Sequence, residues 1–318
     1  MIESLSVVVP VYNSAGILPE LIRRLAAVLP VVARQYEVVL VNDGSADDSA
    51  RVARDVSVAF GWVRRIDLTK NFGQHSALLC GIRAARHRVI VTIDDDLQHP
   101  PEEIPKLLHR LVGAVQVVYG TPERAHHDSW RDTSSKVTKF LLQRLLRVSG
   151  AQSVSAFRAF RTELRDAFAF YQGPHVNIDV MLTWSAGHFA SVPVAHARRA
   201  AGRSNYTFRT LMRHALNMTA GFSTTPLRLA SLVGFFFTAF GCAVFVYAVG
   251  RYVLFGSSVP GFTFLASAIA IFSGAQLFAL GILGEYVGHI FQRSLQMPSY
   301  QVKTDSSHPA QPADVAST

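Results

Sequence analysis

Cysteine, which cross-links small proteins and often binds zinc, is scarce in this sequence. Two of its 318 residues are cysteine, and Cys80 and Cys242 lie in a helical pattern and in a long apolar run. Neither position is typical of a disulfide or of a metal site. The sequence also lacks a zinc signature, a helix-turn-helix pattern and an aromatic-basic recognition pattern, so we expect no nucleic acid among its partners.

Acidic residues are outnumbered, with 22 Asp and Glu against 31 Lys and Arg and a formal net charge of +9. Much of this excess flanks apolar segments, so anionic lipid headgroups and phosphorylated substrates explain it better than nucleic acid does. The mean hydropathy of +0.23 is high for a soluble protein and points the same way.

Charge is nearly absent from two stretches of the chain. Residues 229–255 carry a single charge, on Arg251, and residues 261–284 carry none. A helix needs about 20 apolar residues to cross a bilayer core of roughly 30 Å, and both stretches are longer than that. We therefore predict two transmembrane helices that form a hairpin.

Basic residues flank this predicted hairpin on both sides. Arg209, Arg213 and Arg228 precede the first span, and Arg293 and Lys303 follow the second. The first residues of the chain lack the basic flank and long apolar stretch of a signal peptide. By the positive-inside rule, we expect both termini and the N-terminal domain on the cytoplasmic side of an inner or plasma membrane.

The N-terminal part of the chain alternates between strand and helix patterns. β-Branched runs predict strands at residues 5–9, 36–41, 63–67, 89–93 and 116–119. Apolar residues at helical spacing predict helices at residues 17–29, 48–59 and 73–85. This alternation is typical of an α/β protein with a mostly parallel, Rossmann-like sheet that binds ligands at the carboxyl ends of its strands.

Polar segments follow four of the predicted strands, at Pro10–Asn13, Asn42–Ser45, Lys70–Gly73 and Asp94–Asp96. The carboxyl ends of parallel strands meet at one edge of a sheet. Four polar tips at that edge therefore favour a nucleotide site over four unrelated turns.

The last of these tips is a run of three carboxylates. Because side chains alternate along a strand, we expect Asp94 and Asp96 on one side of the chain and Asp95 on the other. Two converging carboxylates repel each other unless a cation lies between them, and hard oxygen ligands suit Mg²⁺ or Mn²⁺. The alternative is an acidic turn that begins the next helix, for which Pro100–Glu103 has suitable residues.

Segments outside the sheet pattern point to the membrane surface. Residues 129–148 combine apolar residues at helical spacing with Lys and Arg, which predicts a basic amphipathic helix that lies on the membrane or packs on the domain. Residues 207–228 are predicted to be a juxtamembrane amphipathic segment, and the same two alternatives apply to Thr207–Met218 within it. We expect a cytoplasmic juxtamembrane segment at residues 285–302 and a disordered polar tail at residues 303–318.

Several motifs occur in one order along the chain: Val9–Asn13, Val41–Ser45, Asn71–Gly73, Asp94–Pro100, Tyr119–Gly120, Phe157–Arg158 and Gly202–Tyr206. In this order and spacing they resemble family 2 glycosyltransferases with a GT-A fold. More narrowly, the chain resembles the polyprenyl-phosphate glycosyltransferases, which include dolichyl-phosphate mannose synthase and bacterial undecaprenyl-phosphate sugar transferases. The resemblance spans residues 5–210 and implies a GT-A catalytic domain at residues 1–206, followed by a hairpin similar to that of the bacterial members.

The resemblance implies a donor site at the strand tips. Pro10, Tyr12 and Asp43 would hold the nucleotide base, with the Asp43 carboxylate accepting an N–H from the ring. Asp43 could instead cap the helix that follows it. The other residues implied to bind the nucleotide-sugar are Asn13, Asn71, Gly73, Asp94 and Asp95.

The fourth polar tip, Asp94–Asp96, would contain the residues that take part in the reaction. The resemblance implies that Asp96, together with Asp94, binds the Mg²⁺ or Mn²⁺ that bridges the diphosphate, and that Asp94 faces the sugar-nucleotide. The cation would stabilise the charge that builds on the leaving nucleoside diphosphate. Gln98 would point into the same site and contact phosphate or metal-bound water.

The implied acceptor is a lipid phosphate. A phosphate monoester has a second pKa of about 6 and is largely dianionic at pH 7, so it asks little of a general base. Arginine matches phosphate geometry. The candidate acceptor-binding residues, each of which could also be a solvated surface residue, are Arg124, Arg131, Arg199, Arg203, Ser204 and Tyr206.

The sequence departs from the family pattern at two positions. Many relatives carry Gly-Asp before the Phe-Arg pair, and that Asp is often regarded as the base, whereas this chain has Ser155 and Ala156. Asp179 could replace the missing base, or it could simply place a charge at a helix N-terminus. The second departure is Asn205, where relatives often have Lys.

The prediction is an inverting transfer of one sugar from a nucleotide-sugar to an undecaprenyl- or decaprenyl-type phosphate at the cytoplasmic membrane face. A processive polysaccharide synthase is an alternative, but Gln143–Arg147 lacks the Trp of its Gln-x-x-Arg-Trp motif. A catalytically silent membrane scaffold is another, but it would not need Asp43, Asp94 and Asp96. The sugar, the nucleotide, the lipid length and assembly as a homo-oligomer stay open.

Overall fold

The computed structural model describes residues 1–122, 155–173, 176–197, 225–255, 261–295 and 297–306, and every structural statement below concerns these residues. They belong to two compact units. One unit contains a mixed sheet that includes residues 297–306, and the other contains two long helices.

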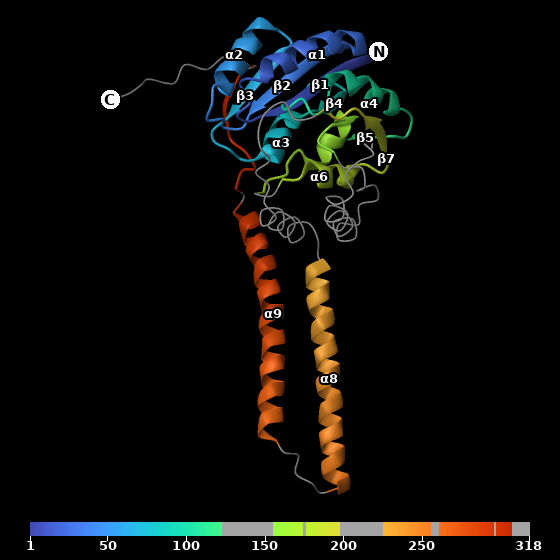
Figure 1. The fold of residues 1–318 in the computed structure, drawn as a ribbon, viewed down its shortest axis with the longest axis vertical. Coiled ribbons are helices and arrows are strands. Elements are labelled where there is room, and N and C mark those ends of the chain that lie inside the picture. The colour runs from blue at the N-terminus through green and yellow to red at the C-terminus, as the bar shows by residue number, and fades with distance from the viewer. Residues whose placement is uncertain (123–154, 174–175, 198–224, 256–260, 296, 307–318) are drawn as a thin grey trace, which may run out of the picture. The chain divides into compact units, whose positions relative to one another are not determined.

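The first unit is built on one eight-stranded sheet with the order β7-β5-β6-β4-β1-β2-β3-β8 (Figure 1). The strands are β1 (Ile2–Val11), β2 (Ala33–Asn42), β3 (Val63–Leu68), β4 (Val89–Thr92), β5 (Val117–Pro122), β6 (Arg158–Arg161), β7 (Phe189–Val194) and β8 (Val302–Asp305). The pairs β1–β2, β1–β4, β2–β3 and β5–β7 are parallel. Strand β6 runs antiparallel to β4 and β5, and β8 runs antiparallel to β3, so the prediction of a mostly parallel sheet is confirmed.

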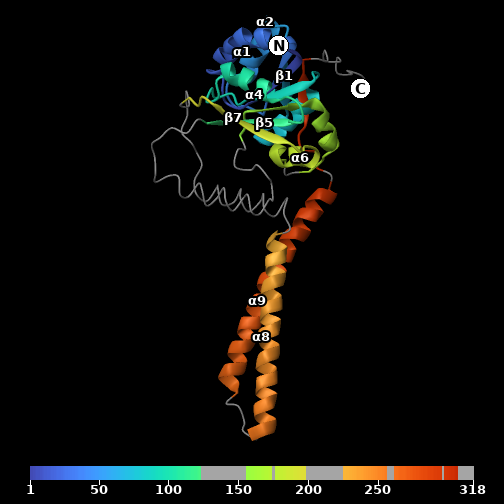
Figure 2. The same cartoon turned by 90° about the vertical axis from the view of Figure 1, so that its right-hand side faces the viewer.

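Helices cover both faces of this sheet (Figure 2). They are α1 (Leu18–Val32), α2 (Ser49–Ala59), α3 (Gln74–Ala84), α4 (Ile104–Arg110) and α6 (Ile178–Ser185), with 3-10 turns at Pro101–Glu103 and Thr162–Phe168. Val7 and Val9 of β1 belong to the core formed with α1 and α4, whereas Val8 belongs to the core formed with α3 and α6. Burial on both faces explains why the central strands read as unbroken apolar runs.

Strand β8 corrects the prediction of a disordered tail that begins at residue 303. It pairs with β3, and the Arg64 guanidinium donates two hydrogen bonds to the Asp305 carboxylate, at 3.0 and 2.6 Å. A short polar strand gives no local signal when the residue that stabilises it lies 241 positions earlier in the chain. The rest of the predicted tail, residues 307–318, lies outside the described residues.

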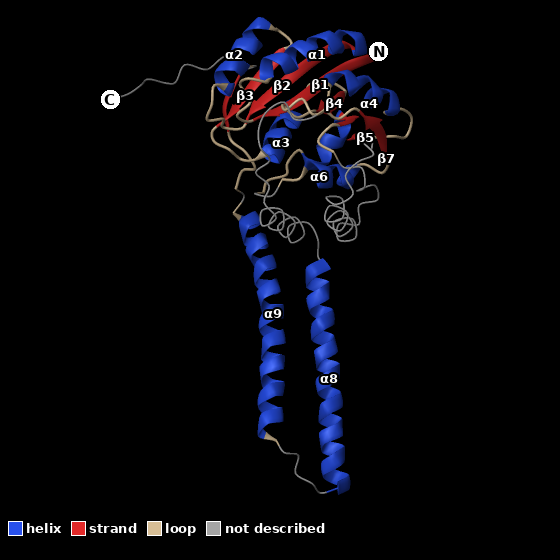
Figure 3. Ribbon diagram, viewed as in Figure 1, coloured by secondary structure: helices blue, strands red, loops and turns tan. Residues whose placement is uncertain are grey.

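The second unit contains α8 (Thr225–Phe255) and α9 (Phe262–Ser294), two long helices that contact each other (Figure 3). The rings of Phe237 and Phe272 meet edge to face with centroids 6.1 Å apart, and a Cβ on Gly241 would lie 3.0 Å from the Phe272 ring. Among the described residues one helical segment, Ala230–Arg251, has the length and apolarity to cross a membrane. The second span of the predicted hairpin stays a prediction.

Candidate functional site

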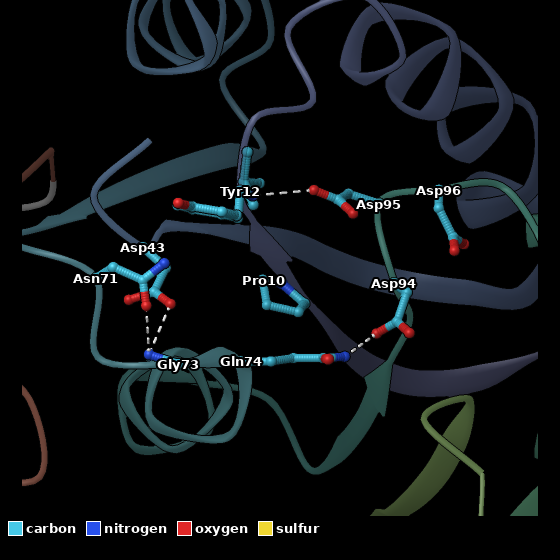
Figure 4. A pocket seen from close by; sticks show the side chains of 10 residues that line it. Pro10, Tyr12, Asp43, Asn71, Gly73, Gln74, Asp94, Asp95 and Asp96 are labelled. Atoms are coloured by element: carbon cyan, nitrogen blue, oxygen red, sulfur yellow. Dashed lines mark hydrogen bonds between the residues drawn. The ribbon is translucent and has the colours of Figure 1, made fainter. Parts of the chain in front are cut away.

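Four loops meet where the parallel strands β1, β2, β3 and β4 end, and they enclose a pocket (Figure 4). The lining residues are Pro10, Val11, Tyr12, Asp43, Asn71, Gly73, Gln74, Asp94, Asp95 and Asp96. The convergence of the four predicted polar tips is therefore confirmed, whereas the roles of their residues stay predictions.

The Asp43 carboxylate ties two of these loops together. Its oxygens accept hydrogen bonds from the backbone N–H groups of Phe72, at 2.7 Å, and Gly73, at 2.9 Å. Gly73 directly precedes α3, so Asp43 holds the start of α3 and not the start of α2, the helix that follows it in sequence. Burial raises the pKa of Asp43, and the two N–H donors oppose that rise. Because a carboxylate has about four lone-pair sites, Asp43 can still accept an N–H from a ligand.

Gly44 lets the same two loops approach each other closely. It has a φ of +63°, and a Cβ at this position would lie 2.5 Å from the Lys70 carbonyl carbon. A side chain here would therefore be strained by the backbone conformation and would also collide with the neighbouring loop.

Asn13 lies outside the pocket lining, although the resemblance implied that it contacts the nucleotide-sugar. Its backbone N–H donates to the Ser45 hydroxyl at 3.1 Å, and its side-chain oxygen accepts the Ala46 N–H at 2.9 Å. Asn13 also adopts a φ of 53°, a conformation that Asn tolerates better than most residues. Asn13 thus holds the loop after β1 against the loop after β2.

At the other end of the pocket, Asp95 lines the same cavity as its two neighbours (Figure 4). The expectation that it points away is wrong, because β4 ends at Thr92 and strand alternation does not continue into the three carboxylates. The Asp95 carboxylate accepts the backbone N–H of Tyr12 at 3.1 Å, which joins the tips of β4 and β1. Burial raises the pKa of Asp95, and hydrogen bonds from Ser14 and Tyr12 oppose the rise.

Asp94 is held by one neighbour and repelled by two others. The Gln74 amide donates to its Oδ1 at 2.7 Å. Burial, followed by repulsion from Asp96 and then from Asp95, raises the pKa of Asp94 to about 6, while Arg158 and Gln74 oppose the rise. Such unbalanced negative charge on hard oxygen ligands is what a divalent cation relieves.

Asp96 completes the group of carboxylates. Its Oδ1 accepts the backbone N–H of Gln98 at 3.0 Å. The Gln98 carbonyl in turn accepts the Ala197 N–H at 2.9 Å, and Gln98 is not among the residues that line the described pocket. Its implied contact with phosphate or metal-bound water stays a prediction.

The carboxylates would supply only part of a metal's coordination shell. Within the described ranges, no group of three or more His, Cys, Asp or Glu residues could hold a metal ion. Mg²⁺ usually takes one or two carboxylates and completes its shell with water and substrate phosphates, so Asp94 and Asp96 fit that mode of binding.

Gln74 and Val11 line the pocket but were not predicted. Gln74 directly follows the Asn71–Gly73 motif and is the first residue of α3, so its position beside a strand tip could have identified it. Val11 is the last residue of β1, and no chemical feature of an aliphatic side chain marks it in the sequence.

The implied base lies elsewhere in the fold. Asp179 is in the first turn of α6, pairs with the Arg158 guanidinium and accepts the Tyr119 hydroxyl at 3.1 Å. Asp179 is not among the described residues that line the pocket. The candidate acceptor residues Arg124, Arg131, Arg199, Arg203, Ser204 and Tyr206 lie outside the described residues, as does the predicted amphipathic helix at 129–148.

Comparison with known proteins gives this site a chemical context. Residues 6–168 match the profile of the family described as "Glycosyl transferase family 2". The chain is 36% identical to an undecaprenyl-phosphate 4-deoxy-4-formamido-L-arabinose transferase of Klebsiella pneumoniae subsp. pneumoniae, over 95% of this chain and 93% of that protein. It is 35% identical to the protein of the same name from another Klebsiella pneumoniae strain, with the same coverage.

A solved structure has a similar fold. It is glucosyl-3-phosphoglycerate synthase from Mycobacterium tuberculosis in complex with Mn²⁺, UDP and phosphoglyceric acid, with a TM-score of 0.52 and 19% identity. The match covers 69% of this chain and 76% of that chain. At this identity the likeness concerns the fold alone, and it confirms a GT-A-like α/β architecture.

Proposed function

The chain belongs to glycosyltransferase family 2, and we propose that it transfers one sugar from a nucleotide-sugar to a polyprenyl phosphate and releases the nucleoside diphosphate. The observation that carries this proposal is the convergence of Asp43 and the run Asp94–Asp96 on one pocket at the ends of parallel strands. The acceptor class is supported by the 36% identity, over 95% of the chain, to a protein named as an undecaprenyl-phosphate sugar transferase.

The nucleotide base binds at the Asp43 end of the pocket. Pro10, Tyr12 and Asp43 form this end together with Asn71 and Gly73. The Tyr12 side chain is 49% exposed, so an aromatic face is free to cover a base at the pocket wall. The Asp43 carboxylate, fixed by two backbone N–H groups, presents its remaining lone pairs to a ring N–H.

The diphosphate binds at the opposite end, beside Asp94, Asp95 and Asp96. A divalent cation, Mg²⁺ or Mn²⁺, would be held there by Asp96 and Asp94, and when bound it would offset the charge that develops on the departing diphosphate. The Gln74 amide orients Asp94, and the Gln98 N–H orients Asp96. The Mn²⁺ in the solved structure with the same fold supports this use of the carboxylates.

The acceptor phosphate acts as its own nucleophile. As a dianion at pH 7 it needs orientation and desolvation more than deprotonation. Its in-line attack on the anomeric carbon, opposite the leaving diphosphate, forms the new C–O bond as the old one breaks and inverts the configuration. Arg124, Arg131 and the segment Arg199–Tyr206 are the proposed phosphate contacts, because the arginine fork matches phosphate oxygens.

The acceptor's lipid chain requires a membrane. The apolar segments of α8 and α9 supply a membrane hairpin in this proposal, with the catalytic domain and both termini on the cytoplasmic side. The positive charge around these segments suits an anionic lipid surface.

The test uses the purified full-length protein with Mg²⁺, undecaprenyl phosphate and a panel of nucleotide-sugars. One donor should yield a lipid product whose mass equals undecaprenyl phosphate plus one sugar. Undecaprenol, which lacks the phosphate, is the matched control and should yield nothing. A polymer, or sugar release without any glycolipid, would contradict the proposal.

A further inference from the structure

A largely buried ion pair joins β6 to α6, with the Arg158 side chain 1% exposed and the Asp179 side chain 18% exposed. Arg158, on β6, is 1% exposed and is among the largest fully buried side chains of the described chain. Its guanidinium pairs with Asp179, on α6, and the same carboxylate oxygen accepts the Tyr119 hydroxyl at 3.1 Å. Both charges thus have partners, as a buried pair requires.

One series of hydrogen bonds connects this pair to the end of β4. The Arg158 Nε donates to the Thr92 hydroxyl at 3.0 Å, and that hydroxyl donates to the Ala156 carbonyl at 2.7 Å. Thr92 is fully buried and is the last residue of β4. Asp94 follows it by two residues, so the backbone that carries this carboxylate into the pocket starts from a fixed point.

A second series of contacts connects Asp179 to the Asp94 carboxylate through α3. The backbone N–H of Ile178, next to Asp179, donates to Nδ1 of His75 at 3.4 Å. Burial lowers the pKa of His75, which agrees with a neutral ring whose Nδ1 accepts. His75 follows Gln74, and the Gln74 amide donates to Asp94 at 2.7 Å. The contacts therefore close a ring through β4, β6, α6 and α3.

We infer that Arg158 and Asp179 are positioning residues: their pair fixes a ring of contacts that orients Asp94 in the donor pocket, and Asp179 does not act as the general base. This inference rests on the proposed function for the role of Asp94. A base must reach the acceptor's proton, whereas Oδ1 of Asp179 is shared by a guanidinium and a phenol, and Asp179 is not among the described residues that line the pocket. The chain thus needs no carboxylate at the place of Ala156, because the phosphate dianion carries its own nucleophilic charge.

The test compares two single variants of the full-length protein that break the pair from either side. Asp179→Asn leaves the Arg158 charge buried without its counter-charge, so kcat should fall by about 10- to 100-fold through misplacement of Asp94. Arg158→Met keeps the Asp179 carboxylate but removes its partner and the donor to Thr92, so kcat should fall by a similar factor. A wild-type kcat in Arg158→Met beside an inactive Asp179→Asn would overturn the inference, because the carboxylate would then matter and its pairing would not.

The affinity for the donor provides a second measurement. It would not change if Asp179 acted only as a base, or if the ion pair only stabilised the fold. With Mn²⁺ present, calorimetry should show a dissociation constant for the nucleotide-sugar about 10-fold weaker in Asp179→Asn, measured well below its melting temperature. Unchanged donor affinity would overturn the inference. If the wild type binds a donor but transfers nothing to undecaprenyl phosphate, the proposed acceptor fails while this comparison still tests the ring.

A matched ion pair far from the pocket serves as the control. Arg64 and Asp305 join β3 to β8 with side chains 13% and 22% exposed, and Arg64→Met with Asp305→Leu should leave donor affinity and kcat unchanged. If Asp179→Asn does not fold, Tyr119→Phe takes its place, because it removes one donor to Asp179 and keeps the ion pair. It should lower donor affinity by about 2- to 5-fold, and an unchanged affinity would count against the inference.

Discussion

The two ends of the pocket treat carboxylates in different ways. At one end, Asp43 is held by two backbone N–H groups and joins two loops before any ligand arrives. At the other end, three adjacent carboxylates face one cavity, and mutual repulsion adds to burial in raising the pKa of Asp94 to about 6. One end is held by hydrogen bonds within the chain, whereas the other gathers repelling charges that a cation would offset.

In the proposed function, this difference suits the carboxylates at the two ends to different tasks. A carboxylate fixed by backbone donors has a constant position and charge, which suits selection of a base by shape and hydrogen bonding. In a cluster of repelling carboxylates, a cation offsets the repulsion and also attracts a diphosphate. Metal and substrate are therefore expected to bind such a cluster together. Substitutions at one end of the pocket at a time can separate these two tasks.

The largest effect is expected from removing the divalent cation. Treatment of the full-length protein with EDTA should abolish sugar transfer, and added Mg²⁺ or Mn²⁺ should restore it, because the carboxylate end otherwise repels the diphosphate. Product formation is followed by mass spectrometry, with Mg²⁺-saturated EDTA as the control. Transfer at full rate in EDTA would show that the carboxylates work without a metal.

Asp96→Asn should have the next largest effect. The variant keeps the size of the side chain and its acceptor for the Gln98 N–H but loses a metal-binding charge, so kcat should fall by about 1,000-fold. The variant should stay folded and unfold cooperatively on heating, because the substitution removes one of the charges whose repulsion destabilises the folded state. Asp55→Asn on α2, an exposed position paired with Arg51, is the matched control, and equal losses in both variants would contradict the assignment.

Asp43→Asn should act at the opposite end and mainly on donor binding. One amide N–H would face a backbone N–H of Phe72 or Gly73, which should lower the free energy of unfolding by about 1–3 kcal/mol. The donor KM should rise by about 10- to 100-fold, with a smaller change in kcat. A kcat loss without a change in KM would place Asp43 in the chemical step and remove the distinction between the two ends.

The smallest effect concerns stability without metal. Because burial and like charges raise the Asp94 pKa from 3.8 to about 6, the unfolded state loses this proton first as pH rises. Asp94 therefore becomes increasingly destabilising between about pH 4 and pH 6. Melting curves in EDTA should show Asp94→Asn gaining stability over the wild type across this range, and a constant difference would contradict the shifted pKa.

Much of the fold follows from the sequence because its strands are buried on both faces. Strands β1 to β5 and helices α1 to α3 are found within a few residues of their predicted positions, and the polar tips mark the pocket. Strands β6, β7 and β8 were not predicted, because short strands whose pairing partners lie far away in sequence carry little local signal.

The site was predicted less fully than the fold. The error over Asp95 arose because the end of β4 depends on tertiary contacts of Thr92 that no local pattern encodes. Likewise, the sequence offered Asp179 as a base or as a helix-terminal charge, and its pairing with Arg158 depends on contacts between β6 and α6. The implied acceptor residues rest on family resemblance and stay proposals.

The most direct test of the contrast between the two ends is a structure of the full-length protein with Mg²⁺ and a nucleoside diphosphate. The account predicts Mg²⁺ about 2.1 Å from a carboxylate oxygen of Asp96, the diphosphate beside Asp94, and the base against Tyr12 with a hydrogen bond to Asp43. A nucleotide bound in the reverse orientation, or a metal held away from Asp94 and Asp96, would contradict it.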